Sequence, residues 1–172
     1  YECQGTLAEG AAYQTLLGDQ LMLAPVYDSN RRGRYVYFPE EMLEVSFLEE
    51  DMTTTIRKKG IHYIEYGLED LKFFLRKNSI LPYVKPSKNV KELDLKNIEI
   101  LAYVDDEAIY ELYDDDGKSY DSSYSTNINI VKKTEDYDVK VDNDNPSIEN
   151  INIKIVDSKN NIKHKEILIR GE

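Results

Sequence analysis

The sequence predicts a mainly β protein made of two antiparallel β-sandwich domains in tandem. Its 172 residues include 14 tyrosines, no tryptophan and many isoleucines and valines, a composition that favours strands over helices. Short apolar segments also recur at spacings of about ten residues, with Asn, Asp, Gly and Lys between them, which is typical of sandwiches. The length allows one large domain or two small domains, each with its own core.

The first half of the chain contains several predicted strands. The most apolar covers residues 16–26 (Leu-Leu-Gly-Asp-Gln-Leu-Met-Leu-Ala-Pro-Val), and such a run is poorly suited to a free chain end. We therefore expect it to belong to a sheet that continues beyond this chain. Turn residues separate the other segments, and Pro39 ends one of them because proline has no N–H to donate. These segments cover residues 34–38, 41–47, 61–66, 71–75 and 80–83.

The second half repeats this pattern after a break in composition. Residues 85–97 are charged and contain a proline, so they are the best candidate for a linker between two domains. Short alternating segments bounded by Asp, Asn, Gly or Ser follow this linker, and they predict a second, smaller antiparallel sandwich. These segments cover residues 98–104, 108–113, 126–132, 137–141, 151–156 and 166–169.

Charge and cysteine content narrow the classes of function. The net charge of −11, from 33 acidic and 22 basic residues, argues against binding to nucleic acids or to anionic membrane surfaces. No apolar segment approaches the roughly 20 residues of a membrane-spanning helix, and no leader is visible before Tyr1, so we expect an excised or processed piece. A lone cysteine, Cys3, excludes an internal disulfide framework and favours a reducing compartment, so we expect a cytoplasmic location.

An acidic cluster is the first candidate site. Residues 114–117 (Asp-Asp-Asp-Gly) lie near Asp105, Asp106 and Asp121, and clustered oxygens suit Ca²⁺. The spacing does not match an EF-hand loop, which needs acidic residues at alternate positions and a Glu at the twelfth. We favour the alternative, a solvated hairpin turn in which Asp residues cap their own backbone and Gly117 takes positive φ.

The chain offers few residues for metal or nucleophilic chemistry. His62, His164 and Cys3 are far apart in the sequence, and no nucleophile-elbow pattern supports a Ser-His-Asp triad. The basic cluster Arg31-Arg32-Gly33-Arg34 is expected to pair with Glu40, Glu41 or a neighbouring domain. We therefore predict no catalytic, cofactor-binding or metal-ligating residue in this chain, and no cofactor.

Tyrosines on the predicted strands leave two interpretations open. Sugar rings stack on aromatic faces, so these strands could form a carbohydrate-binding surface. Alternatively, the rings pack at the edge of a sandwich core with their hydroxyls in water, which is the interpretation we favour. The tyrosines concerned are Tyr35, Tyr37, Tyr63, Tyr66, Tyr103, Tyr110 and Tyr113.

Three blocks of sequence carry a family resemblance, in order along residues 10–125. The first is residues 17–26, and the second comprises residues 33–41, 59–63 and 71–82, ending in Arg-Lys-Asn-Ser-Ile-Leu-Pro. The third is residues 110–120, Tyr-Glu-Leu-Tyr-Asp-Asp-Asp-Gly-Lys-Ser-Tyr. Together they resemble the C-terminal region of glycoside hydrolase family 31, the α-glucosidase group. Asn78 stands where that family usually has Gly, and Asp114 where Glu is common; Asn tolerates left-handed φ, so the turn at Asn78 is expected to persist.

The resemblance implies a parent enzyme that hydrolyses terminal α-glucosidic bonds with retention of configuration. This reaction uses two carboxyl groups about 5–5.5 Å apart, which in the family are Asp residues on earlier strands of a catalytic barrel. No residue of this chain matches either motif, so none is assigned a catalytic role. The resemblance further implies a remnant of the last strand of a (β/α)8 barrel at residues 1–26, a proximal sandwich at 27–97 and a distal sandwich at 98–172.

On this interpretation the chain supports the barrel and contributes to an oligomer interface. Its partners would be the remainder of the parent enzyme, α-glucosides through that parent, and a further copy of the chain. Two other hypotheses stay open at this point. One is a stand-alone carbohydrate-binding β-sandwich module, and the other is a structural β protein unrelated to sugar metabolism.

Overall fold

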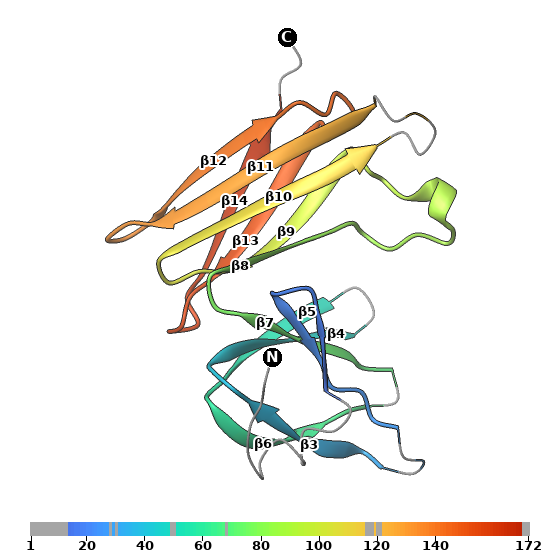
Figure 1. Cartoon of the computed structure of the whole chain (residues 1–172), viewed down its shortest axis with the longest axis vertical. Coiled ribbons are helices and arrows are strands. Elements are labelled where there is room, and N and C mark those ends of the chain that lie inside the picture. Colours follow the sequence, from blue (N-terminus) through green and yellow to red (C-terminus); the bar gives the residue numbers. More distant parts are fainter. Residues whose placement is uncertain are drawn as a thin grey trace. The chain divides into compact units, whose positions relative to one another are not determined.

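The structure is a computed structural model that describes residues 14–27, 29, 31–48, 51–67, 69–115, 119 and 122–169. Within these ranges the regular elements are β-strands, apart from one 3₁₀ helix, η1, at Val90–Glu92 (Figure 1). The predicted mainly β fold is therefore confirmed. No helix in the described part is long and apolar enough to cross a membrane. The chain divides into two compact units, Tyr1–Lys77 and Asn78–Glu172.

The first unit contains a five-stranded sheet and a two-stranded sheet. The strand order in the larger sheet is β1-β2-β7-β4-β5, and all of its pairs are antiparallel. The smaller sheet pairs β3 with β6, also antiparallel. The bounds are β1 Thr15–Leu17, β2 Leu21–Leu23, β3 Gly33–Phe38, β4 Met42–Leu48, β5 Asp51–Arg57, β6 Gly60–Glu65 and β7 Leu71–Arg76.

The inner faces of these two sheets form one core. Along β3, Val36 and Phe38 are fully buried and alternate with side chains that project to the other face, as the two-residue period of a strand requires. The ring of Phe38 packs edge-on against that of Phe74 from β7, with centroids 4.9 Å apart and planes at 84°. The core is completed by Met22, Ala24, Met42 and Ile64. The first unit is thus a small β-sandwich.

The apolar stretch near the start of the chain belongs to this sandwich. We expected residues 16–26 to join a sheet beyond the chain, and residues 1–26 to be a barrel remnant. Instead, β1 and β2 form a hairpin across a turn at Gly18, and β2 pairs with β7 through Leu21↔Leu75 and Met22↔Phe74. Burial of Met22 in the core explains this docking. Residues 1–13 lie outside the described part of the chain.

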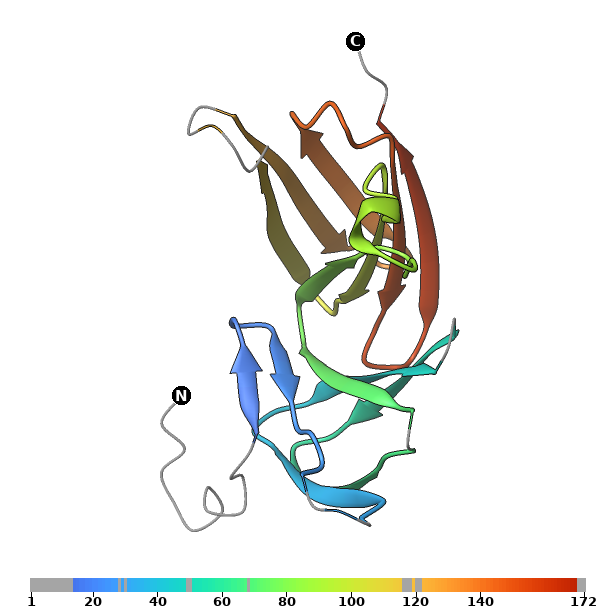
Figure 2. The ribbon, with the colours of Figure 1, turned by 90° about the vertical axis from the view of Figure 1, so that its right-hand side faces the viewer.

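The second unit contains a three-stranded and a four-stranded sheet, which Figure 2 shows as two layers. The smaller sheet has the order β10-β11-β12 and is antiparallel. In the larger sheet, of order β14-β13-β9-β8, β9 and β13 run parallel, which departs from the all-antiparallel prediction. A parallel pair needs a long crossover, and here β10, β11 and β12 supply it. The bounds are β8 Ser79–Tyr83, β9 Asn97–Tyr103, β10 Glu107–Asp115, β11 Ser123–Lys132, β12 Tyr137–Asn143, β13 Asn150–Val156 and β14 Ile162–Leu168.

Alternating isoleucines build the core of the second unit. Neighbouring strands β9 and β13 align Ile98 with Ile151 and Ile100 with Ile153, so the side chains form rows on one face of the sheet. Ile130 on β11 belongs to the same core, together with Ile80, Ala102, Ala108, Ile128, Tyr137, Ile148 and Ile155. Because both sheets contribute buried residues, this unit is also a sandwich.

The boundary between the units differs from the predicted one. We placed the boundary between residues 97 and 98 and a linker at 85–97. The contacts place it between Lys77 and Asn78, because β8 pairs with β9 through Leu81↔Leu101 and so belongs to the second unit. The charged segment 85–97 is therefore a connection inside the second unit, where Asn89 caps η1 by accepting a hydrogen bond from the Lys91 N–H at 3.0 Å.

A tight turn at Asn78 joins β7 to β8. Asn78 has a φ of 58°, in the left-handed region that few residues other than glycine occupy. Its side-chain oxygen accepts hydrogen bonds from the backbone N–H groups of Asp105 at 2.9 Å and Asp106 at 3.1 Å. The predicted persistence of this turn with Asn in place of Gly is confirmed, and the side chain adds contacts that glycine lacks.

This geometry predicts an order of stability among variants at Asn78. Asn78→Ala should lower the free energy of unfolding by about 2 kcal/mol, because it loses both hydrogen bonds and places alanine at positive φ. Asn78→Gly should cost less, since only the hydrogen bonds are lost. Asn78→Asp retains the acceptor oxygen and is the control. Chemical denaturation measures the order, and an alanine variant as stable as the wild type would contradict it.

A buried carboxylate connects the two sheets of the second unit. Asp157, 5% exposed after β13, accepts hydrogen bonds from the N–H groups of Lys159 and Asn161, both at 2.9 Å, and pairs with Lys132 of β11 at 3.3 Å. Lys132 also pairs with Asp105 at 3.3 Å. Burial alone would raise the pKa of Asp157, but the hydrogen bonds from Asn161, Lys159 and Lys132 outweigh it and hold this pKa below its ordinary value of 3.8.

Stability should therefore depend on pH through Asp157. Because its pKa is lowered on folding, the carboxylate stabilises the folded state above the unfolded pKa, and this contribution disappears as the pH falls through the folded pKa. Asp157→Asn should cost about 2 kcal/mol at pH 7, and the difference from wild type should shrink below about pH 4. Unfolding curves across pH measure this, with exposed Asp138→Asn as the control. A difference that is constant with pH would refute the assignment.

Candidate binding surface on the first unit

The described tyrosines range from fully buried to largely exposed. Tyr103 is fully buried and Tyr137 is 8% exposed, with its hydroxyl donating to the carbonyl of Val104 at 3.2 Å. Both lie deeper than the predicted position at the edge of a core with the hydroxyl in water. Tyr66 and Tyr110, partly buried against the two cores, come closer to that prediction. Tyr35, Tyr63 and Tyr113 are instead 66%, 49% and 63% exposed. A packing role does not explain this second group.

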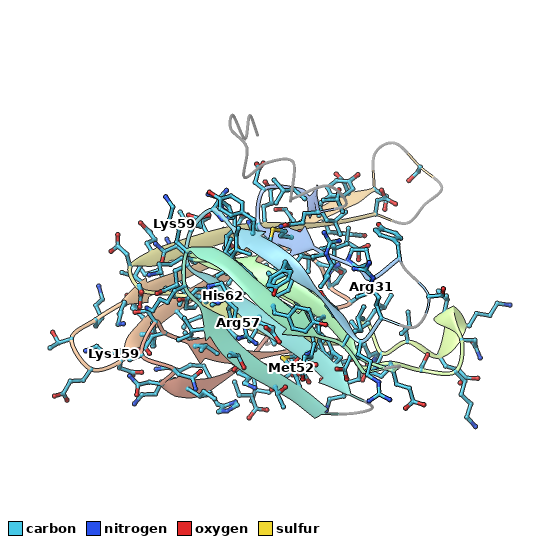
Figure 3. All side chains as sticks on the ribbon, turned by 90° about the horizontal axis from the view of Figure 1, so that it is seen from below. Arg31, Met52, Arg57, Lys59, His62 and Lys159 are labelled. Carbon is cyan, nitrogen blue, oxygen red and sulfur yellow. The ribbon has the colours of Figure 1, made fainter. Side chains whose placement is uncertain are left out.

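Two of the exposed tyrosines are paired on the outer face of the two-stranded sheet. The register of β3 and β6 sets Tyr35 opposite Tyr63 and Tyr37 opposite Ile61. These four side chains project away from the core because their neighbours Val36, Phe38 and Ile64 project into it. The rings of Tyr35 and Tyr63 meet edge to face, with centroids 5.2 Å apart and planes at 69°. Figure 3 shows β3 and β6 in front, with His62 labelled on β6.

A glycine makes room for this ring pair. A side-chain carbon built on Gly33 would lie 2.8 Å and 2.9 Å from Cζ and Cε1 of Tyr63, and 2.5 Å from the carbonyl oxygen of Ile64. The ring of Tyr63 therefore lies over the backbone of Gly33, where any other residue would displace it. We call Gly33, Tyr35 and Tyr63 the tyrosine patch.

Neighbouring groups hold the tyrosine patch in place and give it polarity. The side-chain amide of Gln14 accepts from the N–H of Tyr37 at 2.8 Å and donates to its carbonyl at 2.9 Å, which fixes β3 at that point. Glu65 lies two residues after Tyr63 on the same face and opposite Gly33 in the register. Its backbone carbonyl accepts from the Lys72 ammonium at 2.7 Å. The patch thus combines aromatic faces, phenol hydroxyls and a neighbouring exposed carboxylate.

A buried ion pair and a hydrogen-bonded tyrosine lie elsewhere in the first unit. Glu44, 4% exposed, pairs with Arg57 at 2.6 Å and Lys72 at 3.4 Å, so its charge is compensated within the unit. Burial, with the Glu44 charge, raises the pKa of Tyr66 to about 12, despite the opposing effect of Arg34. The Tyr66 hydroxyl donates to the carbonyl of Ala24 at 2.8 Å. These contacts stabilise the fold and present no group for proton transfer.

The acidic cluster was predicted to be a turn or a Ca²⁺ site. Its described Asp residues contact different partners and do not face a common point. Asp114 accepts from the Asn145 amide at 2.8 Å and from the N–H of Asp115 at 2.9 Å, while Asp105 takes part in the Lys132 pair of the second unit. Asp116, Gly117 and Asp121 lie outside the described residues. Among those that are described, no three His, Cys, Asp or Glu side chains gather as a metal ion would require.

The histidines also lie in unrelated surroundings. The Nε2 atom of His62 is 2.8 Å from the carbonyl oxygen of Lys58, and its ring packs edge-on against Phe38 with centroids 5.4 Å apart. His164 is on β14 of the second unit, opposite Lys154 in the register. Cys3 lies outside the described residues. The structure therefore places the two histidines in different units and in different local roles.

The acidic partners expected for the basic cluster pair with other cations. We expected Arg31, Arg32 and Arg34 to pair with Glu40, Glu41 or a neighbouring domain. Glu40 pairs with Arg76 at the start of the β7–β8 turn, and Glu41 pairs with Lys58 and, at 2.8 Å, with Lys77. Arg34 donates to the carbonyl of Pro25 at 3.0 Å. Glu40 and Glu41 follow β3 directly. They therefore lie beside the last residues of β7, such as Arg76, and not beside the first residues of β7.

Hollows in the described part of the chain are further candidates for binding, and two of them include residues discussed above. One, of about 1040 Å³ in the first unit, is lined by Arg31, Arg32, Tyr66, Asp70 and Lys72 among others. The Lys72 ammonium there pairs with Asp70 at 3.6 Å as well as with Glu44, which reduces its availability to an anionic ligand. The other hollow, of about 240 Å³ in the second unit, is mainly apolar and is lined by Pro82, Tyr83, Val84, Leu95, Ile98, Leu112, Tyr113, Asp114 and Ile148.

The tyrosine pair predicts energetic coupling that a double-mutant cycle can measure. Tyr35→Ala and Tyr63→Ala should together cost less than the sum of the single changes, with a coupling energy of about 0.5–1.5 kcal/mol, typical of aromatic pairs. Free energies of unfolding from denaturant titration give the four members of the cycle. The same cycle between Tyr35 and Tyr113, which lie in different units, is the control and should show no coupling. Strict additivity for Tyr35 and Tyr63 would refute the observed pair.

The fold and these residues can be compared with known proteins. Of the curated relatives, a 1,6-α-glucosyltransferase of Sporosarcina globispora is 26% identical over 117 residues, which cover 64% of this chain and 9% of that protein. The solved structures include a family 31 dextranase of Flavobacterium johnsoniae, with a TM-score of 0.66 and 22% identity over 84% of this chain and 19% of that one. A family 31 α-xylosidase of Xanthomonas citri has a TM-score of 0.60 and 18% identity over 92% of this chain and 20% of that one.

These similarities cover both units of this chain but a small part of each relative. The structural matches show the shared fold, because more than four fifths of this chain superposes on each of the two enzymes. The chain spans about a fifth of their length. At the level of sequence, residues 5–81 match the model of the glycosyl hydrolase family 31 C-terminal domain. The resemblance drawn from the sequence is confirmed over this stretch: residues 5–81 match the C-terminal domain of glycosyl hydrolase family 31, and the chain shares the fold of the C-terminal part of family 31 enzymes.

Proposed function

We propose that this chain is the non-catalytic support of a retaining glycoside hydrolase that acts on α-glucosides. The observation that carries the proposal is the family match over residues 5–81, in a chain that spans only 9% of a glucosyltransferase and 19% of a dextranase. The greater part of such an enzyme, including its catalytic barrel, would be the partner of this region. α-Glucosides would be bound through that partner.

The chemistry of the buried carboxylates supports this role. A retaining glycosidase needs two carboxyl groups about 5–5.5 Å apart, one as nucleophile and one as acid and base. In the described part of the chain, the buried carboxylates are Glu44 and Asp157. The two carboxylates belong to different units. Arg57 and Lys72 pair with Glu44, and Lys132 pairs with Asp157. Their cations and hydrogen bonds fit structural roles rather than attack on a glycosidic bond.

A contribution to oligomers is a second part of the proposal. Strand β5 is the edge of the five-stranded sheet, and its residues 52–56 (Met-Thr-Thr-Thr-Ile) carry no charge and no proline. Edges of soluble sheets are usually protected by charges, prolines or short strands. By comparison, the edge strands β12 and β14 carry Lys140 and Lys163 within their length. The uncharged edge of β5 would suit pairing with a second copy.

Core variants on β7 test the support role. In the full-length enzyme, Phe74→Ala should lower the free energy of unfolding by about 3–5 kcal/mol, because it removes a fully buried ring. It should reduce the amount of active enzyme while leaving KM nearly unchanged. Leu71→Ala, on the same strand but 60% exposed, is the control and should change neither.

The isolated chain gives the complementary test. We expect it to release no glucose from maltose, isomaltose or a chromogenic α-glucoside, because it would lack the paired catalytic carboxyl groups. Hydrolysis by the purified chain would overturn the proposal. A Phe74→Ala enzyme with a changed kcat and unchanged stability would also overturn it, since that result would place this region in the catalytic machinery.

A further inference from the structure

We propose that the tyrosine patch binds one glucosyl ring of a neutral α-glucan. This inference deepens the proposed function, because it gives the supporting region a contact of its own with the substrate class. It concerns Gly33, Tyr35 and Tyr63 on the outer face of β3 and β6. Three features support it: the ring geometry, the exposure of the two rings and the polar groups beside them.

The ring of Tyr63 is held against the sheet and still reaches solvent. It lies close to the backbone of Gly33, while the side chain remains 49% exposed. A pyranose ring presents C–H groups on its faces, and their contact with an aromatic ring removes apolar surface from water. A side chain at position 33 would displace the Tyr63 ring, so the glycine is part of the site.

The ring of Tyr35 adds a second side to the site. It stands at 69° to Tyr63, with its centroid 5.2 Å away, and it is 66% exposed. A ligand that contacts the Tyr63 ring can therefore also contact Tyr35. The edge-to-face contact also restricts the rotamers of both rings in the free protein, which lowers the entropy cost of binding.

Polar groups beside the tyrosine patch suit hydroxyl groups. Each phenol can donate and accept a hydrogen bond, and the exposed carboxylate of Glu65 can accept from two hydroxyls. Ile61 and Tyr37 continue the same face by one further pair of residues, about 7 Å along the strands. The surface is therefore long enough to contact the sugar ring next to the one on the patch.

The charges beside the tyrosine patch are of both signs. Glu65 lies opposite Gly33 in the register, and Arg31, Arg32 and Arg34 flank Gly33 in the sequence, so the two rings and the polar groups, rather than net charge, are what favour a neutral sugar. Two macromolecular occupants compete with the sugar: a second copy of the chain, and the rest of a longer enzyme. Both would cover the rings with protein, so binding and sedimentation experiments can separate them from the sugar.

Titration of the purified chain with isomaltotriose and maltotriose tests the proposal. Binding followed by NMR shifts of the tyrosine ring signals should be saturable, with a Kd on the order of 1 mM, as expected for one small stacking site. Tyr63→Ala and Tyr35→Ala should each weaken binding by about tenfold, because each removes one of the two rings of the site. Tyr63→Phe keeps the ring and should stay within a few-fold of wild type.

Controls make the result decisive. Ile109→Ala removes a similarly exposed large side chain, 61% exposed on β10 of the second unit, that lines neither hollow, and it should leave binding unchanged. Thermal unfolding of each variant verifies that it is folded. No saturable binding by the folded chain, equal loss in Ile109→Ala, or full binding by Tyr63→Ala would overturn the proposal.

Sedimentation of the chain and titration of the full-length enzyme decide between the occupants. A dimer of the chain that dissociates in Tyr35→Ala would show that copies cover this face, and would overturn the sugar site. Binding by the isolated chain that is absent from the full-length enzyme would show that the rest of the enzyme covers it, and would do the same. The support role is measured separately, by stability and yield of active enzyme, so either proposal can fail alone.

Discussion

Packing of Phe38 on Phe74 is the contact on which the first unit depends. It joins the two-stranded sheet to the five-stranded sheet, with both rings fully buried. Because side chains alternate along a strand, burial of Phe38 and Val36 forces Tyr35 and Tyr37 to the opposite face. A shift of register by one residue would bury the tyrosines and expose the phenylalanine. The core therefore determines where the tyrosine patch lies.

In the second unit, the two sheets are joined by smaller apolar side chains and by one ion pair. Rows of isoleucine on β9 and β13 pack within one core with those of β11, so the sandwich is held mainly by apolar burial. Asp157 and Lys132 add a directional contact between its sheets, and the hydrogen bonds at Asp157 satisfy a carboxylate that burial would otherwise destabilise. Apolar packing gives this unit stability, and the ion pair orients the turn after β13.

Local pattern in the sequence was sufficient for some features and insufficient for others. The strands, the alternation of isoleucines and the turn at Asn78 could be predicted because each depends on neighbouring residues. The parallel pairing of β9 with β13 could not, because pairing between distant strands leaves no mark on either segment alone. For the same reason, the docking of residues 21–23 on β7 and the unit boundary before Asn78 differed from expectation. The candidate site shows the same division: alternation indicated that Tyr35 and Tyr37 share a face, but not whether that face is buried or exposed.

The register that buries Phe38 and exposes Tyr35 determines both the core of the first unit and its candidate binding surface. Proton–proton NOEs between aromatic rings test this register in solution. The structure requires NOEs between Tyr35 and Tyr63 and between Phe38 and Phe74, since their centroids are 5.2 Å and 4.9 Å apart. NOEs from Tyr35 to Phe74 or Met42, with none from Tyr35 to Tyr63, would place the tyrosine in the core and contradict this register.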